Sequence, residues 1–436
     1  MAERARFPAL ALAVLAVAAA QAPYPTLGEV EERVRQRIDE AHGQVQRAPS
    51  DASAWGRYGM VLDAHRLLSE AADAYRQAAL LDPDEMRWSY FLATLLEYQD
   101  PTAALEWYER ATRLRPSYAP AKIRYAQTLE TVGRDEDAAA HYHAAAQLDP
   151  SNPLAPFGMG RLALSDDRVE EALGHLQQAY RLDGGTRAIV ISLARAYARS
   201  GQETLARQKV EEARGLPEAL PHKDPLQASV LDEAVDSHSY LHRARTYADV
   251  GDLPRARREI EELLAFAPDF AEAWLVAAGI YDRQGAVAEA LRAARRVLAI
   301  DPDRQGAQSV VAGALVKLGR FDEGEGVATQ VLEGEPDNVH MLMLVAMSAA
   351  QRGAVDEVIE NLDHAYAVRN RGNPLAPVMA QLYDDLAASF ADIGRFEEAA
   401  ARMSQALDVA QESGAPAPQL SDYRQRLTSY RRSAGR

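Results

Sequence analysis

The sequence predicts an all-α solenoid built from about ten stacked helix–turn–helix units, with further helices at its two ends. The 436 residues are rich in Ala, Leu, Arg and Glu, which favour helices, and poor in the β-branched and aromatic runs that mark strands. Two residue types also recur with a period of 34. They are the glycines Gly251, Gly285, Gly319 and Gly353 and the prolines Pro268, Pro302 and Pro336.

The two series divide each period into a helix, a glycine turn, a second helix and a proline stop. Glycine takes the left-handed backbone conformation that ends many helices, and proline cannot continue one. The series extend toward the N-terminus through Gly133, Gly201, Pro83, Pro116 and Pro150. A fixed period of this length is the signature of a repeat protein, in which each unit buries its apolar face against its neighbours.

The clearest unit, residues 52–85, resembles the motif of the tetratricopeptide repeat (TPR) family. That motif alternates large and small residues along both helices and ends in proline. The residues that carry the resemblance are Trp55, Gly59, Leu62, Ala71, Tyr75, Ala78 and Pro83. Ten such units cover roughly residues 52–413. The resemblance implies a right-handed superhelical solenoid.

The eighth position of the unit is small in nine of the ten units, for example at Gly59, Gly160 and Ala278. Antiparallel helices approach closely only where one of them presents a small side chain. We therefore expect the paired helices to cross at this position, with aromatic residues filling the space beside it.

The sequence divides into six segments. These are a signal peptide (1–22), a linker with a capping helix (23–51), units 1–5 (52–214), an insertion (215–236), units 6–10 (237–413), and a C-terminal capping helix and tail (414–436). The insertion should form a loop and a short helix near Leu226–Val235, and seven more residues enter near Arg371–Pro377. Both are interpreted as additions tolerated at junctions between units, since surface loops accept length at little cost. The alternative is that they carry function or break the superhelix.

The N-terminus has the pattern of a cleavable secretory signal peptide. Arg4 and Arg6 precede an apolar stretch, Ala9 to Ala20, that is too short to span a bilayer comfortably. Small residues then follow at positions 20 and 22, where a signal peptidase would cleave. We expect an exported protein, periplasmic or secreted, with an N-terminal membrane anchor as the alternative.

Composition and motifs exclude most chemistry. The formal net charge is −16, so neither nucleic acid nor an anionic membrane is the expected partner. There is no cysteine, no P-loop, no dinucleotide-binding glycine motif and no Gly-x-Ser-x-Gly. His238 and His242 share a helix face, but no third zinc ligand follows. The sequence predicts no enzyme activity, no cofactor and no metal.

The resemblance implies a binding groove on the concave face, lined by particular positions of each first helix. In the middle units these positions are Phe157, Arg161, Ile191, Arg195, Arg199, His238, Leu241 and Arg245. Arginine binds carboxylates and phosphates through paired hydrogen bonds. Because the other positions are mostly apolar, we expect the four arginines to face an acidic peptide or a C-terminal carboxylate. The alternative is that they pair with Glu or Asp of adjacent helices.

These observations predict a non-catalytic scaffold that binds a peptide or protein in its concave groove. One alternative is a structural assembly factor that oligomerises through the ends of the array. Another is the substrate-recruiting subunit of an enzyme complex, but the segments outside the repeats are too short for a catalytic domain.

Removal of residues 1–22 on export would leave Pro23 as the first residue. Intact-mass measurement of the protein from its native host should therefore give a chain that begins at or near Pro23. Soluble cytoplasmic protein that begins at Met1 or Ala2 would contradict the export prediction.

Overall fold

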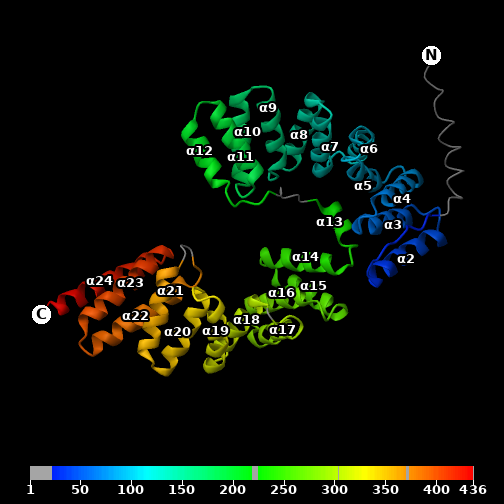
Figure 1. The fold of residues 1–436 in the computed structure, drawn as a ribbon. Helices are drawn as coiled ribbons and strands as arrows, with labels where there is room; N and C mark the ends of the chain where they lie inside the picture. The colour runs from blue at the N-terminus through cyan, green and yellow to red at the C-terminus, as the bar shows by residue number, and fades with distance from the viewer. Residues whose placement is uncertain (1–21, 219–223, 303, 370–372, 436) are drawn as a thin grey trace, which may run out of the picture. The chain divides into compact units, whose positions relative to one another are not determined.

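The structure, a computed structural model, describes residues 22–218, 224–302, 304–369 and 373–435 (Figure 1). Within these ranges the chain forms 23 α-helices, α2 to α24, and no strand. The all-α prediction is therefore confirmed. The helices fall into two compact units, which divide between Asp236 and Ser237. Each unit is described by itself.

Unit 1 contains five helix pairs, preceded by α2 (Glu32–Arg47) and followed by the short α13 (Pro225–Leu231). The pairs are α3 (Ala52–Ala64) with α4 (Leu68–Leu81), α5 (Met86–Leu96) with α6 (Pro101–Leu114), α7 (Ala119–Thr131) with α8 (Asp135–Leu148), α9 (Leu154–Ser165) with α10 (Val169–Leu182), and α11 (Arg187–Arg199) with α12 (Glu203–Glu212). The helices of a pair contact one another, and each second helix contacts the first helix of the next pair. Every repeat thus buries its apolar face on its neighbours.

Unit 2 contains five more helix pairs and a final helix. The pairs are α14 (Ser237–Asp249) with α15 (Leu253–Phe266), α16 (Ala271–Arg283) with α17 (Val287–Ile300), α18 (Gln305–Lys317) with α19 (Phe321–Gly334), α20 (Val339–Arg352) with α21 (Val355–Val368), and α22 (Ala376–Asp392) with α23 (Phe396–Glu412). The last helix, α24 (Ala417–Ala434), packs Tyr423 and Leu427 against the core of the final pairs. It covers the apolar end of the array, as a terminal cap must.

The turns within the pairs have the backbone that the glycine series predicts. All seven turn glycines from Gly133 to Gly394 have positive φ angles, between 71° and 83°. At the corresponding turns of the first and fourth pairs, Arg66 and Asp167 take the same conformation, with φ of 66° and 59°. Side chains disfavour this region, so the packing on either side must hold these two turns in place.

Aromatic rings fill the space above small residues on the facing helix. A Cβ atom added to Gly59 of α3 would lie 2.6 Å from the ring of Tyr75 in α4. One added to Gly158 of α9 would lie 2.3 Å from Tyr142 in α8, the last helix of the preceding pair. Both rings are at most 1% exposed. Small-to-aromatic contacts therefore set the approach of helices within a pair and between pairs.

The insertions differ in detail from the expectation. The helix in the first insertion was expected near Leu226–Val235 but occupies Pro225–Leu231, because Asp224 caps it and Pro225 suits the first helical position. Part of the second insertion, residues 370–372, lies outside the described residues. The pair that follows has helices of 17 residues each, so part of the extra length lies in longer helices.

Of the expected signal peptide, only Ala22 lies in the described part of the chain. Its carbonyl oxygen is 2.9 Å from His42 Nε2, and the Tyr58 hydroxyl donates to the Pro23 carbonyl at 2.8 Å. The chain is thus held against α2 and α3 from residue 22 onward. In the described ranges, none of the helices combines the length and the apolar character needed to cross a membrane.

Two glycine substitutions should have opposite effects on stability. Gly158→Ala places a Cβ inside the Tyr142 ring contact and should lower the free energy of unfolding by about 1–3 kcal/mol. Gly174→Ala on α10, where nothing lies within 4 Å of the added Cβ, should raise it by about 0.5–1 kcal/mol. Thermal and urea unfolding followed by circular dichroism measure both. Equal effects would contradict the close packing at Gly158.

Candidate functional site

The first helices of successive pairs contact one another and form a continuous surface within each unit. In unit 1 these contacts join α7 to α9 and α9 to α11, and in unit 2 they join α14, α16, α18 and α20 in sequence. Five of the predicted groove residues lie on α9 and α11, and three lie on α14. They therefore belong to two surfaces, one in each unit.

Two of the predicted apolar anchors are in the core. Phe157 is 4% exposed and Leu241 is 3% exposed, so neither offers its side chain to a partner. Their large apolar side chains are stabilised more by burial between helices than by a place on the surface. His238 is exposed, with its ring 5.9 Å from that of Phe270. Among the described residues, no group of three or more His, Asp or Glu could hold a metal ion.

A repeated polar contact joins the first four pairs of unit 1. In each of the first three pairs, a buried tyrosine of the second helix donates a hydrogen bond to a carboxylate at or near the end of the first. The bonds are Tyr75 to Asp63 (3.3 Å), Tyr108 to Glu97 (2.5 Å) and Tyr142 to Glu130 (3.1 Å). In the second and third pairs the carboxylate also binds an arginine from the next pair, Arg124 to Glu97 (2.6 Å) and Arg161 to Glu130 (2.5 Å).

This contact gives Arg161 a structural role. Its guanidinium binds Glu130 and lies over the ring of Phe157, with 5.2 Å between the guanidinium carbon and the ring centre. The expectation that no acid faces the groove arginines is therefore wrong at this position. The partner comes from the neighbouring repeat, where stacking places Glu130 of α7 beside α9.

Arg199 and Arg245 also have acidic neighbours. Arg199 donates to the Leu164 carbonyl and lies 3.9 Å from the Asp167 carboxylate. Arg245 pairs with Glu272 of α16 at 2.5 Å. Both pairs are largely exposed, and exposed ion pairs contribute only about 0–1 kcal/mol to stability. Three of the four predicted arginines thus interact with acids of adjacent elements.

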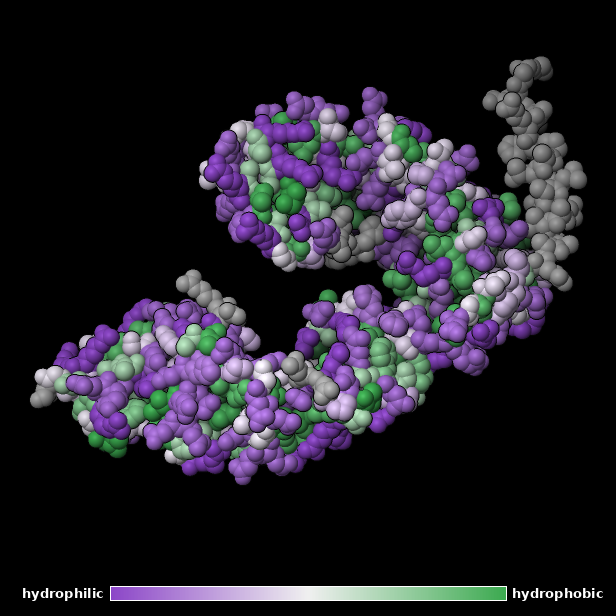
Figure 2. Space-filling model, in the orientation of Figure 1, coloured by the Kyte–Doolittle hydropathy of each residue, from purple (hydrophilic) through white to green (hydrophobic). Residues whose placement is uncertain are grey.

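Arg195 differs from the other three. It is exposed on α11, and no ion pair joins it to any described residue. Together with Ile191 it lines a hollow of about 490 Å³ between α11 and α12. Ala198 and Val210 supply further apolar surface there. In Figure 2, apolar side chains show between polar ones over this end of unit 1.

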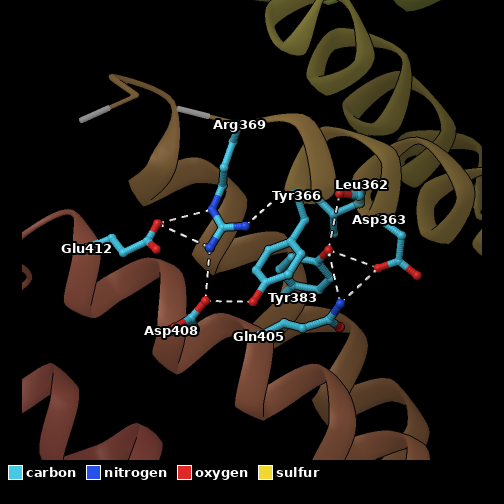
Figure 3. Close-up of polar contacts among 8 residues, drawn as sticks. All are labelled: Leu362, Asp363, Tyr366, Arg369, Tyr383, Gln405, Asp408 and Glu412. Carbon is cyan, nitrogen blue, oxygen red and sulfur yellow. Dashed lines mark hydrogen bonds and ion pairs between the residues drawn. The ribbon is translucent and has the colours of Figure 1, made fainter. Parts of the chain in front are cut away.

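Unit 2 has a polar network of its own where α21 ends (Figure 3). Arg369 pairs with Asp408 and Glu412 of α23 at 2.9 and 3.1 Å and stacks on Tyr366. The hydroxyl of Tyr383 donates to Asp363 at 2.9 Å. Every charge drawn in Figure 3 has a partner, and this network joins the last two helix pairs. It has the character of a packing contact and leaves no group free for a ligand.

Residues 224–235, here called the docked segment, lie against α3 and α5. Asp224 is 5% exposed, and its carboxylate accepts hydrogen bonds from the hydroxyls of Tyr90 and Tyr118, the latter at 2.5 Å. The same carboxylate accepts two backbone N–H groups of α13, at 3.0 and 3.2 Å. One carboxylate thus caps the helix and fixes it to the second and third pairs.

The middle of the docked segment buries apolar side chains in unit 1. Val230 is 3% exposed and joins the main core cluster, and Leu226 packs against the same cluster. The Gln227 side chain donates to the hydroxyl of Thr94 on α5 at 3.1 Å. Helix α13 contacts α3 and lies beside it in Figure 1.

The end of the docked segment is held by polar groups of α2 and α3. The Glu233 carboxylate pairs with Arg37 at 2.6 Å and Arg57 at 3.5 Å. The backbone N–H of Val235 donates to Nε2 of His65 at 3.2 Å. Sequence reasoning missed all these contacts, because the paired groups are more than 100 residues apart and the insertion has no repeat period.

The first tyrosine–carboxylate contact lacks the arginine that the next two have. The position that corresponds to Arg124 one period of 34 earlier holds the uncharged Tyr90, and among the described residues Asp63 forms no ion pair. Burial raises the pKa of Asp63 from 3.8 to about 6, although the Tyr75 hydrogen bond opposes the shift. The pKa of Glu97 is also raised by burial, with Arg124 opposing it.

The raised pKa of Asp63 predicts a pH dependence. The Asp63 carboxyl group holds its proton more tightly in the folded chain than in the unfolded chain. Its contribution to the free energy of unfolding is therefore fully present below pH 4 and is lost as the pH rises through 6. Asp63→Asn keeps an oxygen acceptor for Tyr75 but carries no titrating carboxyl group. The free energy of unfolding of this variant, relative to that of wild type, should therefore rise by about 1–3 kcal/mol when the pH is raised from 4 to 7. Urea unfolding at both pH values measures this difference. The control is Asp73→Asn at an exposed position, and a pH-independent difference for Asp63→Asn would contradict the shift.

Comparison with known proteins finds short matches to other helical-repeat proteins. The TPR repeat-containing protein YpiA of Bacillus subtilis is 23% identical over 161 residues, which are 37% of this chain and 34% of YpiA. The match thus spans about a third of that relative. Solved structures with similar regions include MamA from Desulfovibrio magneticus (15% identity, 42% of this chain and 95% of that one, TM-score 0.32).

Two further structures are similar over comparable lengths. Pseudomonas aeruginosa PilF is 18% identical over 54% of this chain and 96% of its own, with a TM-score of 0.35. YrrB, described as a TPR protein with an unusual peptide-binding site, is 22% identical over 46% of this chain and 95% of its own, with a TM-score of 0.25.

Sequence models described as "Tetratricopeptide repeat" match most of the helix pairs. One matches residues 59–119, 93–153, 157–221 and 241–304, and another matches residues 283–348. The matched segments together cover more than half of the chain and overlap the first nine helix pairs of the structure. The chain belongs to the tetratricopeptide repeat family.

Proposed function

We propose that the protein is a non-catalytic scaffold for a peptide or protein partner, part of which docks in the hollow between α11 and α12. The observation that carries this proposal is Arg195, an exposed arginine outside any ion pair of the described residues, beside an apolar hollow of about 490 Å³. TPR arrays commonly serve as interaction surfaces, and the peptide-binding site described for YrrB agrees with such a role.

The other charged groups of the hollow are balanced. Arg207 pairs with Glu203 and Arg214 with Glu211, both at 2.9 Å. Arg195 is therefore the charge in the hollow that a partner can neutralise without competing with an internal acid. It suits an acidic side chain or a C-terminal carboxylate, which can accept two hydrogen bonds from the guanidinium.

The apolar lining determines the rest of the partner. Ile191, Ala198 and Val210 line the hollow together with Arg195. A buried apolar anchor next to a charge-assisted contact is the usual core of a protein interface. We infer a partner segment with an apolar side chain adjacent to a carboxylate. The net charge of −16 disfavours nucleic acid.

A second candidate function uses the same surface. Because α11 and α12 form the last helix pair of unit 1, the hollow could serve as a contact between copies in an assembly factor. Light scattering separates the two, since a groove scaffold stays monomeric without its partner.

The proposal also places the protein outside the cytoplasm, with cleavage near Ala22, or at the membrane if the N-terminal segment is retained as an anchor.

Reversing the charge at Arg195 should abolish partner capture. Affinity purification from the native host should lose the partner with Arg195→Glu, while the melting temperature stays near that of wild type, because an exposed unpaired charge contributes little stability. The matched control is Arg181→Glu, an exposed arginine on α10 outside the hollow. Capture that persists in Arg195→Glu, or is lost equally in the control, would refute this site.

A further inference from the structure

The docked segment contacts unit 1 in the manner of a bound peptide. Helix α13 has seven residues, whereas isolated helices shorter than about 12–15 residues are marginally stable in water. It does not belong to any of the ten helix pairs and has no antiparallel partner helix of its own. Its helical form therefore depends on the surface beneath it, which is formed by α2, α3, α5 and the residue before α7. We call this the docking surface.

The docking surface presents hydrogen-bond donors to a carboxylate at the start of the docked segment. Tyr90 and Tyr118 aim their hydroxyls at the Asp224 carboxylate. Arg124 adds positive charge nearby, and its own pKa is raised by the acidic groups of this cluster, Asp224 among them, against the effect of burial. Without a carboxylate, two largely buried hydroxyls would lose their acceptor, which is unfavourable away from water.

The remaining contacts define the rest of the ligand. Leu226 and Val230 are four residues apart, so they lie on one face of a helix and enter the apolar part of the surface together. Arg37 and Arg57 bind a second carboxylate, that of Glu233. The matching ligand is a short helix with an acid at its N-cap, apolar residues two and six positions later, and an acid nine positions later.

We propose that the docking surface is a binding site for a helix of this pattern in a partner protein, and that residues 224–235 occupy it as an internal competitor. Covalent attachment gives the docked segment a high effective concentration, so a partner must displace it. This site lies on other helices than the Arg195 hollow, and it stands or falls independently of that hollow.

The test measures binding of a fluorescein-labelled peptide with the sequence of residues 224–235. The full-length chain with Leu226→Ser and Val230→Ser should release its own segment and bind the peptide at least tenfold more tightly than wild type. The matched control is Leu231→Ser, on the same helix but 61% exposed, which should bind like wild type. Fluorescence anisotropy gives the dissociation constants.

Two further variants test the recognition of the carboxylate. In the released chain, Tyr118→Phe should weaken peptide binding at least tenfold, and a peptide carrying Asp224→Ala should bind the released chain at least tenfold more weakly. Should the double serine variant misfold, Asp224→Ala in the full-length chain provides a milder release. Hydrogen exchange should then show faster exchange at residues 226–235 while the helix pairs remain protected.

Each outcome decides the proposal. Tighter peptide binding after release, with dependence on Tyr118 and on the peptide carboxylate, supports it. If a released and folded chain binds the peptide no better than wild type, the proposal is overturned. If every release variant loses the helicity of unit 1, the docked segment is a permanent part of the core and the proposal is equally overturned. Partner capture through Arg195 is measured separately, so neither result affects the other.

Discussion

The contact between a residue without a bulky side chain and an aromatic ring on the facing helix determines how this chain stacks. Gly59 beneath Tyr75 and Gly158 beneath Tyr142 leave no room for even one more carbon atom. Such packing is as dense as an organic crystal, so it fixes both the distance and the rotation between helices. The period of the sequence follows from this packing, since each repeat must place small and aromatic residues at the same positions to fit the next repeat.

The same tyrosine rings organise the polar groups. Each buried ring brings a hydroxyl into the core that needs an acceptor, and a carboxylate near the end of the first helix supplies it. In the second and third pairs that carboxylate also binds an arginine from the next repeat, and for this reason Arg161 is not available to a ligand. Arg195 has no such partner among the described residues, and so the surface chemistry of unit 1 is centred there.

The fold could be predicted from the sequence because its determinants are local. The turn glycines and stop prolines act within one repeat, and the ten helix pairs follow from them. The candidate site could be predicted only in part. The partners of Arg161 and Arg245 lie 31 and 27 residues away on neighbouring repeats, and stacking rather than spacing brings them together. The burial of Phe157 and the contacts of Asp224 likewise depend on tertiary packing, which the repeat spacing of the sequence does not reveal.

The hydrogen bond between Tyr90 and Asp224 joins residues 134 positions apart. In a solenoid, folding can otherwise proceed from neighbour to neighbour with short loops to close. During synthesis the first three repeats emerge and stack long before Asp224 leaves the ribosome. Their tyrosine hydroxyls are hydrated over that interval, and the apolar face that later receives Val230 is open. Completion of unit 1 therefore depends on a contact of far greater sequence separation than the contacts that stack one helix pair on the next.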